Sequence, residues 1–358
     1  GPVVAVTGSN GKTTTKQFIA SVLREYYRAD GVLATEGNLN NHIGVPLTLL
    51  RLREAHEVAV IEMGMNHFNE IALLSALAEP TIALITNAGP AHLEGVGSVE
   101  GVAAAKGEIF LGLRKDGVAV LNADDPFLPY WQVQARAHPR VTFGLSKVAD
   151  VQGQYDPAGT TLKLRLSAVA EPCDVKLPFA GEHNARNALA AAAVARVLGV
   201  SVEEIASGLE SASNIGGRLS RRILANGATL IDDSYNANPA SMRAAAGVLL
   251  AESGPKFMVI GDMAEMGSSS EEMHQALLAE FAKLPFAAVL TLGERMQRAA
   301  TAMAIPPDRV ATFTDIDALA ADVKTRLTPD AAMLVKGSRS MAMERVIQKL
   351  EPTHKGTH

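Results

Sequence analysis

The stretch Val3-Val4-Ala5-Val6-Thr7-Gly8-Ser9-Asn10-Gly11-Lys12-Thr13-Thr14 decides the fold class. Its apolar beginning predicts a buried strand, its glycines predict a tight turn, and Thr13 begins a helical pattern. In such a strand–turn–helix the backbone N–H groups of the turn face a phosphate. Lys12 supplies positive charge for the terminal phosphates, and the Thr13 hydroxyl is placed to bind Mg²⁺. The stretch predicts a nucleoside triphosphate site but does not indicate which reaction it serves.

The spacing within this loop differs from the common phosphate-binding template. That template has four residues between its glycines, whereas two residues separate Gly8 from Gly11. A chance Gly-Lys-Thr at a helix start is the alternative, but the strand before it and the helix after it favour a phosphate loop. The residues expected to bind the nucleotide here are Gly8, Asn10, Gly11, Lys12, Thr13 and Thr14.

Short apolar strands alternate with helical patterns along the first part of the chain, which predicts a mostly parallel sheet with helices on both faces. Strands are expected at 3–6, 58–62, 81–86 and 118–121, and helices at 13–27, 68–77, 99–113 and 184–198. The segment 141–179 carries alternating apolar and polar residues, which predicts a small antiparallel ribbon.

The polar, glycine-rich segment 213–218 predicts a domain boundary. We expect a central ATP-binding domain at 1–215 and a smaller Rossmann-like α/β domain, the ligase domain, at 216–358. In the latter, strands are expected at 229–232, 257–260, 288–292, 310–313 and 333–335, and helices at 240–251 and 271–283.

Composition narrows the class of protein. The 358 residues are 47% hydrophobic and carry a formal net charge of −5, which gives no indication of a nucleic-acid groove. The single cysteine, Cys173, excludes an intrachain disulfide and fits a reducing cytoplasm. We expect a cytoplasmic chain without membrane insertion. The first core strand begins almost at residue 1, so we expect a further N-terminal segment in the natural protein.

Further motifs along residues 3–350 extend the pattern. They are Gly37-Asn38-Leu39-Asn40-Asn41, Val60-Ile61-Glu62-Met63-Gly64, Thr86-Asn87-Ala88-Gly89-Pro90-Ala91-His92-Leu93-Glu94, Ala105-Lys106-Gly107-Glu108-Ile109-Phe110, Gly181-Glu182-His183-Asn184-Ala185-Arg186-Asn187, Gly217-Arg218, Asp232-Asp233-Ser234-Tyr235-Asn236-Ala237-Asn238-Pro239 and Lys336-Gly337-Ser338-Arg339-Ser340. Together with the shortened phosphate loop, they resemble the Mur ligase family, which includes the folylpolyglutamate synthases. The resemblance implies an ATP-dependent amide ligase that activates a carboxylate as an acyl phosphate.

The last two motifs imply the substrates. They look most like a family member acting in peptidoglycan precursor synthesis, with UDP-N-acetylmuramoyl-tripeptide and D-Ala-D-Ala as partners of a monomeric enzyme. The family's uridine-binding domain has no counterpart here, so we expect poor turnover of the sugar peptide. Alternatives within the family are a ligase for another amino acid or a folylpolyglutamate synthase. Outside it, the alternatives are an ATP- or GTP-driven switch or motor and a nucleotide-binding module without turnover.

The metal and catalytic residues come partly from position and partly from the resemblance. Glu62 ends a predicted strand, and a carboxylate there suits Mg²⁺. The resemblance implies that His92 shares a second Mg²⁺ with Glu62, and that Lys106 is carbamylated by CO₂ and joins them. Without it, His92 and Lys106 would be ordinary surface residues. The catalytic set is then Lys12, Lys106, His92 and Asn38, the last positioning the transferring phosphate.

The resemblance also implies contacts for the rest of the substrates. Near the nucleotide it places His183 and Asn187 at adenine, Arg218 at a phosphate, and Asp233 at the ribose, with Asp232 as the alternative. Tyr235, Asn236 and Asn238 would line the substrate cleft, and Lys336, Ser338 and Arg339 would meet the dipeptide. The plainer interpretations are helix capping for His183 and Asn238, and an ordinary basic loop at 336–339.

Overall fold

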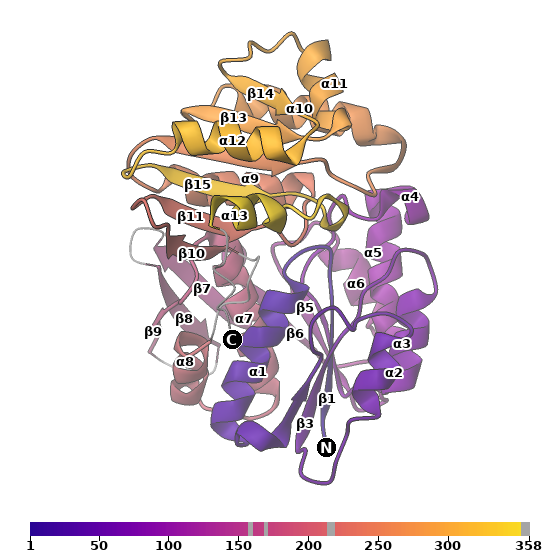
Figure 1. Ribbon diagram of the computed structural model, residues 1–358. Coiled ribbons are helices and arrows are strands. Elements are labelled where there is room, and N and C mark those ends of the chain that lie inside the picture. The colour runs from indigo at the N-terminus through magenta and orange to yellow at the C-terminus, as the bar shows by residue number, and fades with distance from the viewer. Residues whose placement is uncertain (157–159, 168–170, 213–218, 352–358) are drawn as a thin grey trace, which may run out of the picture. The chain divides into compact units, whose positions relative to one another are not determined.

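Two compact units make up the protein, Gly1–Ser213 and Asn214–His358. The structure, a computed structural model, describes residues 1–156, 160–167, 171–212 and 219–351 (Figure 1). The predicted boundary segment 213–218, with Gly216, Gly217 and Arg218, lies outside the described residues. Each unit is an α/β sheet with helices on both faces, which confirms the predicted fold class.

The first unit has a mostly parallel sheet that ends in an antiparallel ribbon. In the described residues this sheet has nine strands in the order β2-β3-β1-β4-β5-β6-β7-β8-β9. The strands are β1 (Val3–Thr7), β2 (Val32–Ala34), β3 (Val58–Glu62), β4 (Ile82–Ile85), β5 (Val118–Asn122), β6 (Arg140–Gly144), β7 (Val151–Asp156), β8 (Thr161–Leu166) and β9 (Cys173–Lys176). β7, β8 and β9 pair antiparallel, and all other pairs are parallel.

The start of the predicted ribbon needs correction. Residues of β6 were expected to be antiparallel, but β6 pairs parallel with β5, with Leu121 opposite Thr142. A helix that the sequence patterns did not predict, α6 (Leu128–Gln134), lies between these two strands. A crossover through a helix allows two consecutive strands to run in the same direction. The antiparallel ribbon therefore begins at β7.

Helices cover both faces of this sheet. On one face lie α1 (Lys12–Tyr26), α7 (Glu182–Val197) and α8 (Val202–Glu210), whose apolar residues share one core. The other face carries α3 (Glu70–Ala78), α5 (Val99–Gly107) and α6. The predicted helix 99–113 continues past α5 as a 3-10 turn, η2 (Glu108–Leu111). Shorter elements are η1 (Ala29–Gly31), α2 (Gly44–Leu49) and α4 (Leu93–Val96).

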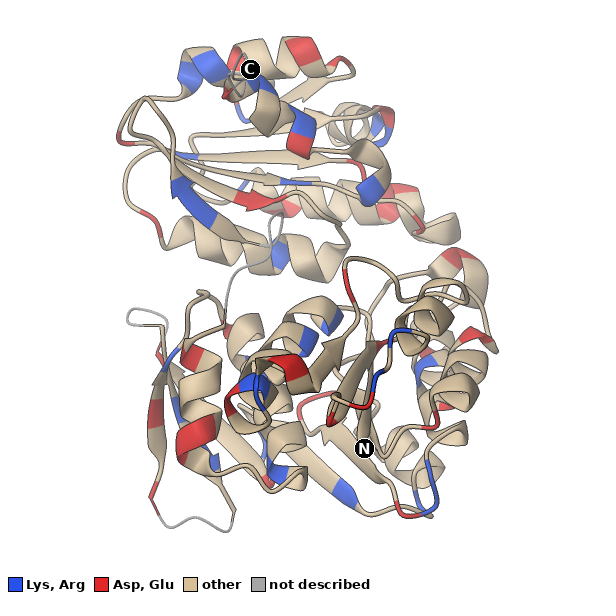
Figure 2. Ribbon diagram, turned by 60° about the horizontal axis from the view of Figure 1, so that its bottom comes forward, with Lys and Arg blue, Asp and Glu red and all other residues tan. Residues whose placement is uncertain are grey.

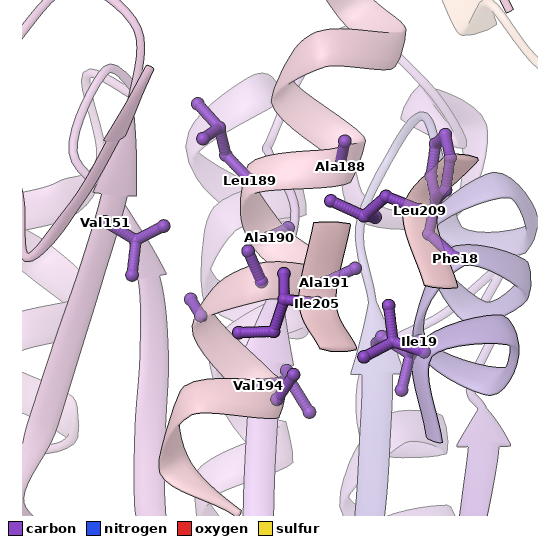
Figure 3. Close-up of a cluster of buried hydrophobic side chains, with 14 of the residues drawn as sticks. Phe18, Ile19, Val151, Ala188, Leu189, Ala190, Ala191, Val194, Ile205 and Leu209 are labelled. Atoms are coloured by element: carbon purple, nitrogen blue, oxygen red, sulfur yellow. The ribbon is translucent and has the colours of Figure 1, made fainter. Parts of the chain in front are cut away.

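The alanine run of α7 lies in the middle of the first core. Ala188, Ala190 and Ala191 have no exposed surface, and they lie among Phe18 and Ile19 of α1 and residues of α8 (Figure 3). A methyl side chain lets a helix approach its neighbours closely and adds little cost in side-chain entropy. α7 can therefore contact the sheet and α1 at once, which sets the position of its first turn beside the phosphate loop.

The second unit is a smaller open sheet. Within the described residues it has six strands in the order β10-β11-β15-β12-β13-β14. The strands are β10 (Ser220–Ile223), β11 (Thr229–Asp233), β12 (Lys256–Gly261), β13 (Ala288–Leu292), β14 (Val310–Phe313) and β15 (Ala332–Lys336). β10, an edge strand that the sequence patterns did not predict, pairs antiparallel with β11, and the other described pairs of this second sheet are parallel.

Its helices also lie on both faces of the sheet. One core contains residues of α9 (Pro239–Leu250), α10 (Ser270–Phe281) and α11 (Glu294–Ala302). The other contains residues of α12 (Ile316–Arg326) and α13 (Glu344–Leu350). Two 3-10 turns, η3 (Gly267–Ser269) and η4 (Arg339–Met341), lie in loops that follow strands.

Charged residues are interspersed over helices and loops of both units, whereas the strands are mostly uncharged (Figure 2). This follows from the cost of burying charge between a sheet and its covering helices. Among the helices of the described residues, none combines the length and apolarity that crossing a bilayer requires.

The close approach of α8 to α1 gives a test of the packing. A Cβ at Gly208 would lie 2.4 Å from the Cα of Val22, a backbone atom that cannot move aside. We expect Gly208→Ala to lower the free energy of unfolding of the first unit by about 1–3 kcal/mol, as overpacking does. Urea unfolding followed by the fluorescence of Trp131, the only tryptophan, measures this.

Ser207→Ala is the matched control, because Ser207 is exposed on the same helix. It should leave the free energy of unfolding within about 0.5 kcal/mol of the wild-type value. Equal midpoints for the two variants would contradict the close helix contact.

Candidate active site

The phosphate loop follows β1 and leads directly into α1. Its glycines have positive φ angles, 153° at Gly8 and 78° at Gly11, which other residues adopt with strain. The Lys12 side chain folds back over the loop, and its Nζ donates to the carbonyl of Gly8 at 2.7 Å. An α-helix leaves its first N–H groups without acceptors inside the helix, so the start of α1 suits an anion.

A neighbouring loop, residues 86–92, holds the phosphate loop in place. The N–H of Ser9 donates to the carbonyl of Asn87 at 3.0 Å, and the N–H of Asn10 donates to Asn87 Oδ1 at 2.9 Å. Thr86 Oγ1 donates to the carbonyl of Asn10 at 2.7 Å. Because β4 pairs with β1, the two loops emerge from neighbouring strands at the same edge of the sheet.

Glu62 lies at the end of β3, on the other side of β1, where it is opposite Val6. Its Oε1 accepts a hydrogen bond from Thr13 Oγ1 at 3.1 Å and another from Asn40 Nδ2 at 2.9 Å. The side chain is 2% exposed. A hydroxyl and a carboxylate oxygen brought together beside a phosphate loop are the hard donors that Mg²⁺ prefers. The structure brings Thr13 and Glu62 together, and their roles as magnesium ligands stay predictions.

Two residues that the sequence patterns did not single out hold Glu62. Lys16 is buried, and its Nζ lies 3.5 Å from Glu62 Oε2 and donates to the carbonyl of Thr35 at 2.7 Å. Asn40 contacts the carboxylate, whereas Asn38, the residue singled out from the same motif, is exposed. The available signal for Lys16 was its position three residues after Thr13, on the same face of α1.

His92 lies in the loop after β4, directly before α4. Its φ angle is 56°, in the left-handed region that few residues other than glycine adopt. The same loop is tied to the end of β5, because the N–H of Ala88 donates to Asp125 Oδ2 at 2.9 Å. Among the described residues, no group of three or more His, Cys, Asp or Glu side chains is arranged for a metal. The shared site of His92 and Glu62 therefore stays a prediction.

Lys106 is fully buried near the end of α5. Its Nζ has no hydrogen-bond partner among the described residues, which is unusual for a buried amine. Burial holds the pKa of Lys106 well below its usual range, the charge of Lys12 lowers this pKa further, and Glu108 opposes the shift. Lowering the pKa favours the neutral amine, which is the form that reacts with CO₂. The site therefore fits a carbamate, whose oxygens would complete the donor set.

The first turns of α7 meet the phosphate loop. A Cβ at Gly11 would lie 2.2 Å from Asn187 Oδ1, so the two residues are in close contact. Asn187 is buried, and His183 is half-buried one turn earlier. In the part of the chain that the structure describes, no side chain caps α7, and Asn184 donates to the carbonyl of Ala180 at 2.7 Å.

In the second unit, the residues predicted to contact the ribose and the substrates lie at and after the ends of β11 and β15. These two strands are parallel neighbours, with Asp233 opposite Lys336. Lys336 Nζ lies 2.7 Å from Asp233 Oδ2 and also donates to the carbonyl of Asn236 at 2.7 Å. Asp232 Oδ1 accepts hydrogen bonds from the N–H and Oγ of Ser234. Both acids have local partners, so the choice between them as the ribose contact stays open.

The remaining predicted substrate residues lie in the same two loops. Asn238 caps α9, since its Oδ1 accepts from the N–H of Ser241 at 2.9 Å, while Asn236 is exposed and Tyr235 half-buried. Ser338 Oγ donates to the carbonyl of Asp262 at 2.7 Å. Arg339 is exposed and pairs with Glu344 at 2.8 Å. Arg218 lies outside the described residues.

Comparison with known proteins identifies the family. A model of the Mur ligase middle domain matches residues 6–195, and a model of the Mur ligase glutamate ligase domain matches residues 217–339. The chain belongs to the Mur ligase family. This Mur ligase is an ATP-dependent enzyme, as the phosphate loop and the family resemblance predict.

Similar proteins cover nearly all of this Mur ligase. The UDP-N-acetylmuramoyl-tripeptide–D-alanyl-D-alanine ligase of Haemophilus influenzae is 40% identical over 352 residues, which are 97% of this chain and 76% of the relative. The crystal structure of MurF from Acinetobacter baumannii has a TM-score of 0.89 and 38% identity over 98% of this chain and 76% of that one. MurF from Thermotoga maritima, solved in complex with ADP, has a TM-score of 0.86 and 30% identity over 98% and 80% of the two chains.

The buried pair of Lys16 and Glu62 gives a stability test. We expect Lys16→Met to lower the free energy of unfolding by about 3–5 kcal/mol, because it leaves a buried carboxylate without its cation. Arg51→Met is the control, since Arg51 pairs with Glu36 at an exposed site, where such a pair contributes at most about 1 kcal/mol. Urea unfolding followed by Trp131 fluorescence compares the two variants. A smaller loss for Lys16→Met than for Arg51→Met would show that Lys16 does not stabilise Glu62.

Proposed function

We propose that this Mur ligase joins D-Ala-D-Ala to UDP-N-acetylmuramoyl-tripeptide, with ATP as the phosphoryl donor, in cytoplasmic peptidoglycan precursor synthesis. The support is the name carried by a relative that is 40% identical over 97% of the chain, together with the MurF structure that holds ADP. The single cysteine supports a reducing compartment.

One observation carries the proposal at the level of chemistry. The Thr13 hydroxyl meets the Glu62 carboxylate at 3.1 Å directly beside the phosphate loop. These two residues would hold one Mg²⁺, and Glu62, His92 and a carbamylated Lys106 would hold a second. Bound there, Mg²⁺ neutralises charge on the phosphate oxygens and so makes the phosphorus easier to attack.

The reaction then proceeds in two transfers. A carboxylate oxygen of the tripeptide attacks the γ-phosphorus of ATP, the bond from that phosphorus to ADP breaks, and an acyl phosphate forms. The amine of D-Ala-D-Ala attacks the acyl carbon, phosphate leaves with the carbon–oxygen bonding pair, and the nitrogen loses its proton. Lys12 would balance the charge on the transferring oxygens, and Asn38 would orient the transferring group. The backbone of the phosphate loop fixes the triphosphate.

The residues of the second unit suggest how the dipeptide is bound. The dipeptide loop, residues 336–340, begins at the last residue of β15. Lys336 is 3% exposed and bonded to Asp233 and Asn236, so we assign it to holding the carboxylate of Asp233 in place. Arg339 is exposed, and a guanidinium binds a carboxylate through two parallel hydrogen bonds. We therefore propose that Arg339, released from Glu344, meets the dipeptide carboxylate, and that Ser338 and Asn236 lie beside it.

A nucleotide-driven switch is the rival from another class, and product release separates the two. A switch hydrolyses ATP alone, whereas a ligase needs both acceptor and amine. We expect phosphate release only when ATP, Mg²⁺, UDP-N-acetylmuramoyl-tripeptide and D-Ala-D-Ala are all present. Equal release without the dipeptide would overturn the ligase assignment for this chain.

Lys106 gives the sharpest test of the metal assignment. We expect Lys106→Ala to lower ligation at least about a hundredfold, because it removes a metal ligand and even the loss of a residue that supports a ligand costs about 10- to 100-fold. The affinity for ATP should change little. Acetate or propionate should restore part of the activity, because a small carboxylate can replace the carbamate. The measurements are phosphate release and ATP binding by calorimetry.

Lys115→Ala serves as control, because Lys115 is exposed in a turn after η2. It should leave both measurements unchanged. Full activity of Lys106→Ala would remove Lys106 from the catalytic set, and a loss that carboxylates never restore would argue against the carbamate.

A further inference from the structure

His274 is a buried histidine with two specific hydrogen bonds to backbone groups. It lies on α10, and its side chain has no exposed surface. Its Nε2 lies 3.0 Å from the backbone N–H of Met263, and its Nδ1 lies 2.6 Å from the carbonyl oxygen of Ser270. An N–H can only donate, so Nε2 must be the acceptor and Nδ1 must carry the proton. The surrounding backbone therefore requires a neutral imidazole in one tautomer.

The residue that His274 holds belongs to the loop after β12, residues 261–267. Both backbone groups of Met263 are bonded to side chains, its N–H to His274 and its carbonyl to Nη1 of Arg295 at 2.9 Å. The preceding Asp262 is fixed as well, because its carboxylate accepts the N–H groups of Arg295 and Met296 at the start of α11. The loop is thus pinned between α10 and α11.

This loop in turn holds the dipeptide loop. The carbonyl of Asp262 accepts both the N–H of Ser338 at 3.1 Å and the Oγ of Ser338 at 2.7 Å. β12 and β15 are parallel neighbours, so the two loops emerge side by side at the carboxyl edge of the sheet. The carbonyl of Asp262 and the N–H of Met263 belong to one peptide group. That single group therefore links the hydrogen bond to His274 with the two hydrogen bonds that fix Ser338.

We propose that His274 is a positioning residue for the dipeptide loop, acting through Met263 and Asp262 on Ser338. This inference rests on the proposed function, in which residues 336–340 bind D-Ala-D-Ala. Loss of the hydrogen bond to Met263 would let the loop after β12 move, and Ser338 would lose its fixed position. The expected result is weaker dipeptide binding with little change in the affinity for ATP.

Protonation gives His274 a recognisable pH signature. A protonated Nε2 would face the N–H of Met263 donor to donor, which breaks the contact. The charged groups that face His274 are Asp262 from the loop, and Arg295 and Arg298 from α11. Burial lowers the pKa of His274, helped by the two arginines and opposed by the Ser270 carbonyl and Asp262. A lowered pKa means that the contact is intact at neutral pH and is lost as the pH falls below the usual histidine range.

Two substitutions separate the hydrogen bond from the volume of the ring. His274→Gln places an amide oxygen where Nε2 lies, so it can accept from Met263 at any pH. His274→Leu fills a similar volume but leaves the Met263 N–H without an acceptor. We expect His274→Leu to raise the KM for D-Ala-D-Ala about tenfold, the size of one lost buried hydrogen bond, while the KM for ATP stays within about twofold of the wild type.

His274→Gln should recover most of the dipeptide affinity, and the acidic fall in kcat/KM for the dipeptide should flatten. The control for a merely structural role is Leu277→Ala, a fully buried core change on the same helix. It should destabilise the second unit without raising the KM for the dipeptide at temperatures where the variant is folded. Hydrogen exchange at the Met263 amide should be fast in His274→Leu and slow in His274→Gln.

The outcomes distinguish this inference from the proposed function. A wild-type enzyme whose phosphate release does not depend on D-Ala-D-Ala refutes the proposed function. If that dependence is present but His274→Leu and Leu277→Ala share the wild-type KM for the dipeptide, the positioning role alone is refuted. Equal KM increases in His274→Gln and His274→Leu would also overturn it, because only the latter removes the acceptor.

Discussion

The buried carboxylate of Glu62 is the constraint on which the first unit depends. An ionised group with 2% of its side chain exposed is costly unless charges and hydrogen bonds compensate it. The compensating groups come from separate segments: Thr13 and Lys16 from α1, and Asn40 from the loop after β2. The pairing of β1 with β3, the rotation of α1 about its axis and the path of the loop must all agree before this carboxylate is satisfied.

The second unit places a similar pair at the equivalent edge of its own sheet. Asp233 and Lys336 lie opposite each other at the ends of two parallel strands. There, however, backbone groups do much of the holding, as the Asp262 carbonyl does for Ser338. Main-chain contacts depend less on side-chain identity than ion pairs do.

Local motifs explain which parts of the structure could be predicted from sequence. The phosphate loop and Glu62 were found because a strand, a turn and a helix each leave a pattern within a few residues. Lys16 was missed because a lysine in a helix is normally exposed, and only the fold reveals that α1 turns it toward Glu62. Short elements such as β2 and α4 span too few residues for a period to show, and the direction of β6 depends on α6, whose pattern is weak.

The contact between Gly11 and Asn187 has a consequence for redesign of this fold. The phosphate loop and the start of α7 are far apart in sequence, yet there is no room for one additional carbon atom between them. A side chain at position 11 would require the Asn187 amide to move aside, and the φ angle of 78° would strain it as well. A larger residue at position 187 would in turn press on the phosphate loop, so any redesign of the start of α7 is limited by the volume that the glycine leaves.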